Sequence, residues 1–269
     1  MIKKITVLGA LAMLLFPSCS KYQQLLKSND YEEKYQMAFV YYNQGDYYRS
    51  IQLFDQVLPF YRGTDRAETI AYTYAYAHYN QKDYMLASFY FKKLTTNYPR
   101  SKYLEECTFM SAYCKHLDSP RHSLDQSSTE EAIEELQFFI NKFPGSERVD
   151  EANNLIDNLR AKLELKAMEM ARLYYKMENY NAAITSLNNI LKDFPDTDFR
   201  EEVMITILKA RYDYADKSIE DKKESRFKEA LETYDNYIAQ FPSGDYEHEA
   251  NQIQRNILRY LNSYSKSSL

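Results

Sequence analysis

Glycine is scarce in this sequence, and tryptophan is absent. Only 5 of the 269 residues are glycine and 7 are proline, whereas 27 are tyrosine. Folds built from strands and tight hairpins need more glycine, because their turns use backbone conformations with positive φ. The composition therefore argues against a β-rich fold and predicts an all-α protein whose helices are joined by short turns.

The usual motifs of catalysis are missing as well. The sequence has no glycine-rich phosphate loop and no nucleophile elbow. Its 39 acidic residues outnumber its 34 basic ones, and the net charge of −5 makes binding to nucleic acid unfavourable. None of the 4 histidines has metal-ligand spacing with a cysteine. We therefore predict a binding protein that has no enzyme activity, no cofactor and no metal.

Only 3 cysteines are present, and two of them lie on one expected helix. Cys107 and Cys114 are separated by about 10 Å along the axis of that helix. This distance is too long for a disulfide bond. We expect both to be small residues of the core.

The longest apolar run lies at the N-terminus, where two lysines precede residues 5–16. A transmembrane helix needs about 20 apolar residues, so this run is too short to span a membrane. It has instead the layout of a secretory signal peptide. No other run approaches spanning length.

The third cysteine, Cys19, stands directly after this run in the segment Leu15-Phe16-Pro17-Ser18-Cys19. The segment resembles a bacterial lipobox, in which the cysteine is acylated and becomes the mature N-terminus. We predict that residues 1–18 are a signal peptide, that Cys19 carries a lipid anchor, and that residues 19–30 form a short tether. The alternative is an ordinary signal peptide followed by a chance cysteine.

The rest of the chain contains an internal repeat. Four segments end in an aromatic residue followed by proline, at Pro99, Pro144, Pro195 and Pro242, and an alanine stands twelve residues before each proline. Apolar residues recur at helical spacing between the alanine and the proline, which ends the helix. These four alanines are Ala87, Ala132, Ala183 and Ala230, and Ser50 takes the same place in an earlier copy.

Each repeat also has an upstream helix with a small residue of its own. Ala38, Ala75 and Ala171 precede the small residue of the second helix by twelve positions, whereas Ala112 and Ala210 precede it by twenty. Small residues allow two helices to pack closely. The longer spacing predicts an enlarged turn inside repeats three and five, at residues 117–129 and 217–225.

The small-small-aromatic-proline pattern of Ala75, Ala87, Phe91 and Pro99 resembles the tetratricopeptide (TPR) repeat. The resemblance implies an all-α, TPR-like helical solenoid of five helix pairs. Residues 148–177 depart from the period, since they lack proline and glycine and keep one apolar face throughout. We predict one long helix there, joining an N-terminal half with repeats one to three (31–150) to a C-terminal half with repeats four and five (151–269).

The stretch around the fourth repeat resembles the BamD family, lipoprotein subunits of the outer-membrane β-barrel assembly machinery. The resemblance rests on Leu159-Arg160-Ala161-Lys162-Leu163-Glu164, Ala171-Arg172-Leu173-Tyr174-Tyr175, Tyr180-Asn181-Ala182-Ala183-Ile184 and Leu191-Lys192-Asp193-Phe194-Pro195-Asp196-Thr197. It implies a scaffold that is lipid-anchored to the cell outer membrane on its periplasmic face. Its implied partners are the periplasmic domains of the barrel-forming subunit and unfolded outer-membrane proteins. The alternative is another outer-membrane TPR lipoprotein, such as a glycan-capture component or an envelope scaffold.

In TPR proteins three positions of each first helix face the concave side: three before, one after and four after the small residue. In the first three repeats these positions are almost all aromatic. Tyrosine offers a large apolar face and a polar tip, which suits an adaptable peptide-binding groove. The predicted partner-binding residues are Tyr35, Phe39, Tyr42, Tyr72, Tyr76, Tyr79, Phe109, Tyr113, Arg172 and Arg211.

Two alternatives remain open for these residues. In a tightly wound superhelix the rings would pack on the neighbouring first helix instead of facing a ligand. Arg172 and Arg211 would either clamp carboxylates of a partner or pair with local acids such as Glu169 or Asp213.

Overall fold

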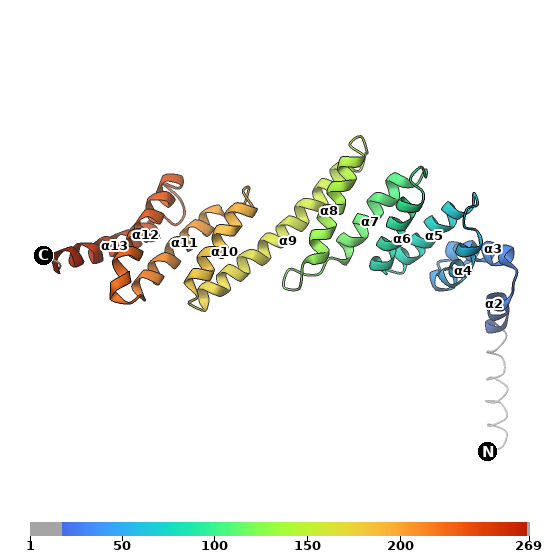
Figure 1. Cartoon of the computed structure of the whole chain (residues 1–269), viewed down its shortest axis with the longest axis horizontal. Helices are drawn as coiled ribbons and strands as arrows, with labels where there is room; N and C mark the ends of the chain where they lie inside the picture. Colours follow the sequence, from blue (N-terminus) through green and yellow to red (C-terminus); the bar gives the residue numbers. More distant parts are fainter. Residues whose placement is uncertain (1–17, 268–269) are drawn as a thin grey trace, which may run out of the picture. The chain divides into compact units, whose positions relative to one another are not determined.

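Every element of secondary structure in residues 18–267, the part of the chain that the computed structural model describes, is an α-helix (Figure 1). The all-α prediction is confirmed. No helix in this range is long and apolar enough to cross a membrane. The helices are α2 (Ser18–Lys27), α3 (Tyr31–Asn43), α4 (Tyr47–Phe60), α5 (Ala67–Asn80), α6 (Tyr84–Asn97), α7 (Leu104–Asp118), α8 (Ser127–Lys142), α9 (Val149–Lys176), α10 (Tyr180–Asp193), α11 (Arg200–Asp216), α12 (Glu220–Gln240) and α13 (Glu247–Ser267).

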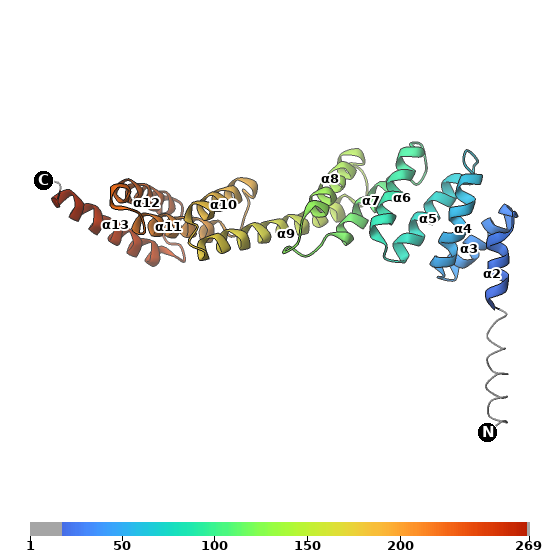
Figure 2. The same ribbon diagram turned by 60° about the horizontal axis from the view of Figure 1, so that its bottom comes forward.

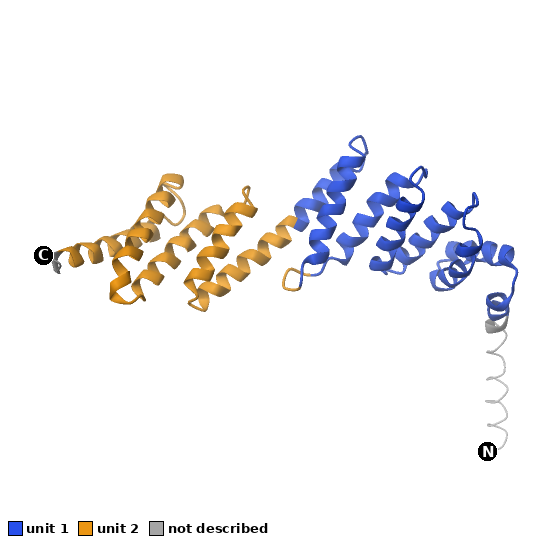
Figure 3. Cartoon of the chain, viewed as in Figure 1, with its two compact units in different colours: residues 1–120, 125–159 blue, residues 121–124, 160–269 orange. Residues whose placement is uncertain are grey.

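The chain forms two compact units, coloured separately in Figure 3. Unit 1 ends at Leu159, and unit 2 begins at Arg160 and also takes in the short segment Arg121–Leu124. The division between them falls inside α9. The predicted signal peptide lies outside the described residues, and so does the side chain of Cys19.

Unit 1 contains three helix pairs, α3/α4, α5/α6 and α7/α8, each packed on the next. The small residues predicted for these pairs are completely buried: Ala38, Ser50, Ala75, Ala87, Ala112 and Ala132. Ser50 replaces alanine at little cost, because its hydroxyl donates to the carbonyl oxygen of Ala38 at 2.9 Å. The first half of α9 completes this core through Ala152 and Leu159.

Unit 2 repeats the arrangement with α10, α11 and α12, and α13 packs on the last pair. Met168 and Ala171, from the second half of α9, share a core with Leu187 and Ile190 of α10. The five predicted helix pairs are therefore present, and the chain is a TPR-like solenoid (Figure 2).

The predicted long helix is confirmed. Helix α9 has 28 residues, twice the 14 of α10. The two other cysteines also lie where the sequence placed them, since Cys107 and Cys114 are buried and free. Burial raises the pKa of both thiols to about 12, so they are unreactive at neutral pH.

Two segments that were not predicted as helices are largely helical. The segment predicted as a tether forms α2, and Tyr22 and Leu25 on it are only 8% exposed. Apolar residues at a spacing of three, as in Tyr22 and Leu25, are typical of a helix that packs on a core. The second predicted turn is also largely helical, because α12 begins at Glu220 and extends over 21 residues. Residues 119–126, in contrast, do form an enlarged loop.

Three of the turns inside helix pairs share one backbone design. Asp46, Asp83 and Asn179 accept a hydrogen bond from the backbone three residues later and so cap α4, α6 and α10. The residue directly before Asp46 is glycine with φ of 78°, whereas Lys82 before Asp83 has φ of 62°. Lysine at a positive φ carries a strain that glycine does not.

Replacing Lys82 with glycine is expected to stabilise the protein by up to about 1 kcal/mol. The left-handed conformation costs a non-glycine residue about 1–2 kcal/mol, and the extra chain entropy of glycine offsets about 0.5–1 kcal/mol of that gain. The midpoint of urea unfolding, followed by circular dichroism, measures the change. As the matched control, Gly45→Ala introduces the same strain in the preceding pair and should lower the midpoint. A lower midpoint for Lys82→Gly would contradict the prediction.

Candidate functional site

The predicted aromatic positions of unit 1 form a series of rings on α3, α5 and α7. Ring centroids lie 5.0 Å apart for Tyr35 and Phe39, and 4.8 Å apart for Tyr72 and Tyr76. The Asn80 side chain connects α5 to α3 by donating to the hydroxyl of Tyr42 at 3.4 Å. We call this series the aromatic ladder; its members are Tyr35, Phe39, Tyr42, Tyr72, Tyr76, Tyr79 and Tyr113, all of them half-buried.

Phe109 does not belong to the ladder surface, although the sequence placed it there. Its side chain is 1% exposed, and its ring packs against Phe139 in the core of unit 1. The guanidinium of Arg148 covers the ring at 4.6 Å. The loop between α8 and α9 supplies this arginine, and a pattern that follows only the first helices does not include that loop.

The middle of the ladder is tied to the next first helix by one carboxylate. Glu106 of α7 accepts hydrogen bonds from Tyr72 at 2.9 Å and from Tyr76 at 2.5 Å. Burial, and then the hydrogen bond to Glu106, raise the pKa of both hydroxyls. These two rings therefore pack on the neighbouring helix, which is the alternative considered for them above.

At the start of the ladder, Tyr35 lies under a charged group that the sequence pattern missed. The guanidinium of Arg66 lies 4.7 Å from the centroid of the Tyr35 ring and pairs with Glu32 at 2.5 Å. Tyr61 donates to the same carboxylate at 2.9 Å. Arg66 lies in the loop before α5, and its place over Tyr35 depends on how the first two repeats pack. The spacing of residues within the first helices therefore could not indicate it.

In unit 2 the two predicted arginines pair with acids, but not with the ones that the sequence indicated. Arg172 pairs with Glu202 at 2.5 Å, and Arg211 pairs with Glu229 at 3.0 Å. Glu169 pairs instead with His122, and Asp213 accepts the hydroxyl of Tyr175. Both arginine pairs are solvent-accessible, so each contributes at most about 1 kcal/mol.

Arg211 does not share the orientation of Arg172, because the register predicted for repeat five was wrong by two residues. Glu106 stands six positions before Ala112 and accepts a hydrogen bond from Tyr76, the residue after Ala75. Glu202 accepts one in the same way from Arg172, the residue after Ala171. Six positions after Glu202 is Leu208, which is completely buried. Leu208, and not Ala210, is therefore equivalent to the small residue, and Arg211 faces α12.

This shift places Arg211 in a hollow of about 140 Å³ between α10, α11 and α12. Arg226 lies over the ring of Tyr214 at 3.8 Å and also donates to its hydroxyl at 2.7 Å. The Nε atom of Arg211 is buried and has no hydrogen-bond partner in the described part of the chain. With two guanidinium groups and one carboxylate, from Glu229, the hollow suits an acidic side chain. We call it the arginine hollow.

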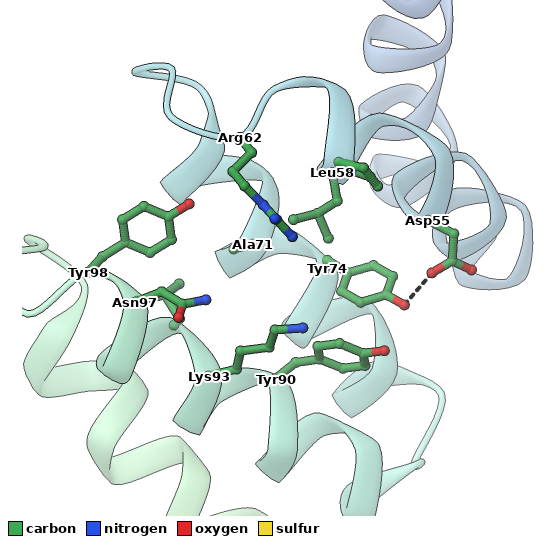
Figure 4. A pocket seen from close by; sticks show the side chains of 11 residues that line it. Asp55, Leu58, Arg62, Ala71, Tyr74, Tyr90, Lys93, Asn97 and Tyr98 are labelled. Atoms are coloured by element: carbon green, nitrogen blue, oxygen red, sulfur yellow. Dashed lines mark hydrogen bonds between the residues drawn. The ribbon is translucent and has the colours of Figure 1, made fainter.

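A second hollow, of about 200 Å³, opens in unit 1 between α4, α5 and α6 (Figure 4). Tyr74 forms part of its wall and donates to Asp55 at 2.5 Å. Arg62, from the loop after α4, and Lys93, from α6, extend into it. It lies on the side of the second helices, and its lining residues include none of the aromatic ladder.

No group of three or more histidine, cysteine, aspartate or glutamate side chains within the described residues could hold a metal ion. The aromatic ladder consists of aromatic rings, and the arginine hollow is lined mainly by charged and polar side chains.

Replacing Glu106 with leucine should lower the free energy of unfolding by about 1–3 kcal/mol, because two buried hydroxyls lose their acceptor. The raised pKa of Tyr72 and Tyr76 means that their contribution to stability is fully present below pH 10.0 and is lost as the pH rises through the folded values. Without Glu106 these tyrosines should ionise at lower pH, which a titration of tyrosinate absorbance measures.

The matched control for this experiment is Glu130→Leu. Glu130 is an exposed acid in the first turn of α8, outside the aromatic ladder. Its loss should leave the tyrosine titration unchanged. Identical titration curves for Glu106→Leu and the wild-type protein would contradict the role given to Glu106.

Comparison with known proteins gives matches of two kinds. No curated protein sequence matches the chain. Among solved structures it is similar to the P58(IPK) TPR domain, with 12% identity, a TM-score of 0.41, and coverage of 91% of this chain and 69% of that one. It is also similar to a TPR repeats protein from Bacteroides fragilis, with 14% identity, a TM-score of 0.38, and coverage of 87% and 100%. The TPR2AB domain:pHSP90 complex of yeast Sti1 gives 14% identity, a TM-score of 0.38, and coverage of 84% and 98%.

The match to a protein family is more informative than these similarities. A family model named YfiO and described as outer membrane lipoprotein matches residues 27–224. The matched span covers the first four helix pairs, the first helix of the fifth pair and the first residues of α12. The chain therefore belongs to the YfiO family of outer membrane lipoproteins.

Proposed function

We propose that the protein is a lipid-anchored periplasmic scaffold of the outer-membrane β-barrel assembly machinery, as the resemblance to BamD implies. It binds the periplasmic domains of the barrel-forming subunit and receives unfolded barrel precursors. It acts by binding and has no catalytic role. The observation that carries the proposal is the match of residues 27–224 to an outer-membrane lipoprotein family.

The aromatic ladder is the surface that we assign to precursors. Tyr42 and Tyr79 belong to its half-buried members, and the hydroxyl of Tyr42 accepts a long hydrogen bond of 3.4 Å from Asn80. Half-exposed rings with polar tips accept many different side chains at little entropic cost. Unfolded barrel strands alternate apolar and polar residues, so they offer apolar groups to the rings and a backbone to the hydroxyl groups.

The arginine hollow is the surface that we assign to a folded partner. A small cavity with guanidinium groups in fixed positions accepts an acidic side chain from a rigid surface better than from a flexible chain. The hydrogen bonds of Arg226 to Ser218 and Tyr214 hold its guanidinium in place. A carboxylate of the barrel-forming subunit is the ligand that we assign to the hollow.

Lipidation of Cys19 is the attachment to the outer membrane. Replacing Cys19 with serine removes the acylated thiol, so the protein should move from the outer-membrane fraction to the soluble periplasmic fraction and lose incorporated palmitate. Cys107→Ser is the matched control, because Cys107 is buried and free and should have no effect on either measurement. A serine variant of Cys19 that remained in the membrane with its palmitate would contradict the assignment.

Alanine at both Tyr42 and Tyr79 should weaken binding of a synthetic peptide from the last strand of a barrel protein by tenfold or more. Each aromatic anchor of an interface typically contributes more than about 1 kcal/mol. Fluorescence anisotropy of the labelled peptide measures the affinity. The control is Tyr48→Ala, which removes an exposed tyrosine that lies on α4 and outside the ladder. Unchanged affinity in a double variant with wild-type helicity would rule out the ladder as the binding surface.

Capture of the barrel-forming subunit from solubilised outer membranes, compared with binding to a glycan array, tests the function as a whole. The proposal expects the subunit to be retained and the array to remain empty. Binding to glycans without retention of the subunit would instead support the glycan-capture alternative.

A further inference from the structure

The turns inside the first two helix pairs of unit 1 lie along one edge of that unit (Figure 1). Residues 43–46 connect α3 to α4, and residues 80–83 connect α5 to α6. Helices α4 and α6 both begin at this edge and run away from it. We call the two connecting turns, together with the first residues of α4 and α6, the turn edge.

Helix α2 also begins at the turn edge. Near its start, the hydroxyl of Tyr22 donates to the carbonyl oxygen of Arg49 at 3.2 Å, and the ring meets that of Tyr41 at 5.5 Å. Near its end, the carbonyl oxygen of Leu26 accepts from Lys34 at 3.1 Å. Tyr41 and Arg49 flank the turn between α3 and α4, whereas Lys34 lies at the far end of α3. The direction of α2 is therefore fixed by contacts at both of its ends.

Cys19 comes three residues before Tyr22, which is about 4.5 Å along a helix. Tyr22 is 8% exposed and also donates to Gln52 at 2.8 Å. The position of the proposed lipid anchor is therefore fixed relative to the first helix pair, and a flexible tether does not separate them. An acyl chain on Cys19 would bring the turn edge to the level of the lipid headgroups.

The turn edge exposes apolar side chains in the places where a membrane would meet them. Tyr48, in the first turn of α4, is 65% exposed, and Met85, in the first turn of α6, is 69% exposed. Phe89 follows Met85 one helical turn later and is 55% exposed. Large apolar residues that gather on one edge mark an interaction surface, whereas single exposed residues do not.

The two aspartates at this edge already have hydrogen-bond donors within the chain. Asp46 accepts the backbone N–H of Arg49 at 3.1 Å and pairs with its guanidinium at 3.3 Å. Asp83 accepts the backbone N–H of Leu86 at 3.3 Å. Both carboxylates therefore keep a hydrogen-bond donor when the edge meets lipid headgroups, and the carboxylate of Asp46 also keeps its cation.

We infer that the turn edge is a membrane-contact surface, on which Tyr48, Met85 and Phe89 enter the interfacial region of the bilayer beside the acyl chains of Cys19. The inference rests on the proposed lipid anchor and extends it. Aromatic and methionine side chains in the interface bury apolar surface, and a covalent acyl chain keeps them there. Unit 1 is then held to the membrane in one orientation.

Single tryptophans test this inference, since the natural sequence contains none. The variants are Tyr48→Trp and Met85→Trp, and the matched control is Phe60→Trp. Phe60 is 58% exposed and is the last residue of α4, the helix whose first turn contains Tyr48. The control therefore differs from Tyr48→Trp mainly in the edge at which it lies. The full acylated chain is reconstituted in vesicles of phosphatidylethanolamine and phosphatidylglycerol with brominated acyl chains.

The expected result is a blue shift and bromine quenching of the fluorescence at positions 48 and 85, with neither change at position 60. Equal quenching at positions 48 and 60, or none at either, in a chain that floats with the vesicles would overturn the inference and leave the anchor intact. A chain that does not float with the vesicles would overturn the proposed anchor and the inference with it.

Discussion

In three of the five helix pairs, a hydrogen bond between the end of the pair and the start of its own first helix is the constraint that sets where the next element begins. Ser101, in the turn after α6, donates to Glu68 of α5 at 2.7 Å, and Ser146, after α8, donates to Glu105 of α7 at 2.6 Å. In the last pair the backbone of Tyr246 bonds to Glu201 at 3.3 Å. Each of these bonds fixes where the chain leaves one pair and therefore where the next pair begins. The carboxylates also lie in the first turns of their helices, where negative charge is favoured.

This constraint explains why insertions inside a pair are tolerated. The turn inside the α7/α8 pair is five residues longer than the turn inside α5/α6, yet the closing bond is of the same type and of similar length. In the last pair Gly244 stands in the place of that serine, since a Cβ atom there would overlap the Glu201 carboxylate. The added residues therefore extend a loop in one pair and a helix in the other without displacing the pair that follows.

The sequence predicted the helix pairs, the long α9 and the buried small residues, because proline, alanine and apolar spacing are local signals. It failed where a position depended on packing between elements. Counting back from Ala230 selected Ala210, whereas the contacts of Glu202 identify Leu208 as the equivalent residue. Phe109 was assigned to the surface because the pattern could not include Arg148 from a distant loop. The direction of α2 likewise depends on Tyr22 meeting side chains about thirty residues away.

The aromatic ladder and the turn edge have a spatial relation that bears on how a precursor would be handled. Tyr42 and Tyr79 lie in the last turns of α3 and α5, the ends of these helices that meet the turn edge, whereas Tyr35 and Tyr72 lie nearer the opposite ends. With the turn edge against the bilayer, Tyr42 and Tyr79 become the part of the ladder closest to the lipid. An extended segment that follows the rings of one first helix would then run between the periplasm and the membrane surface. A lipid anchor held rigidly by α2 would thus do more than retain the protein, because it would set the direction in which a bound segment points.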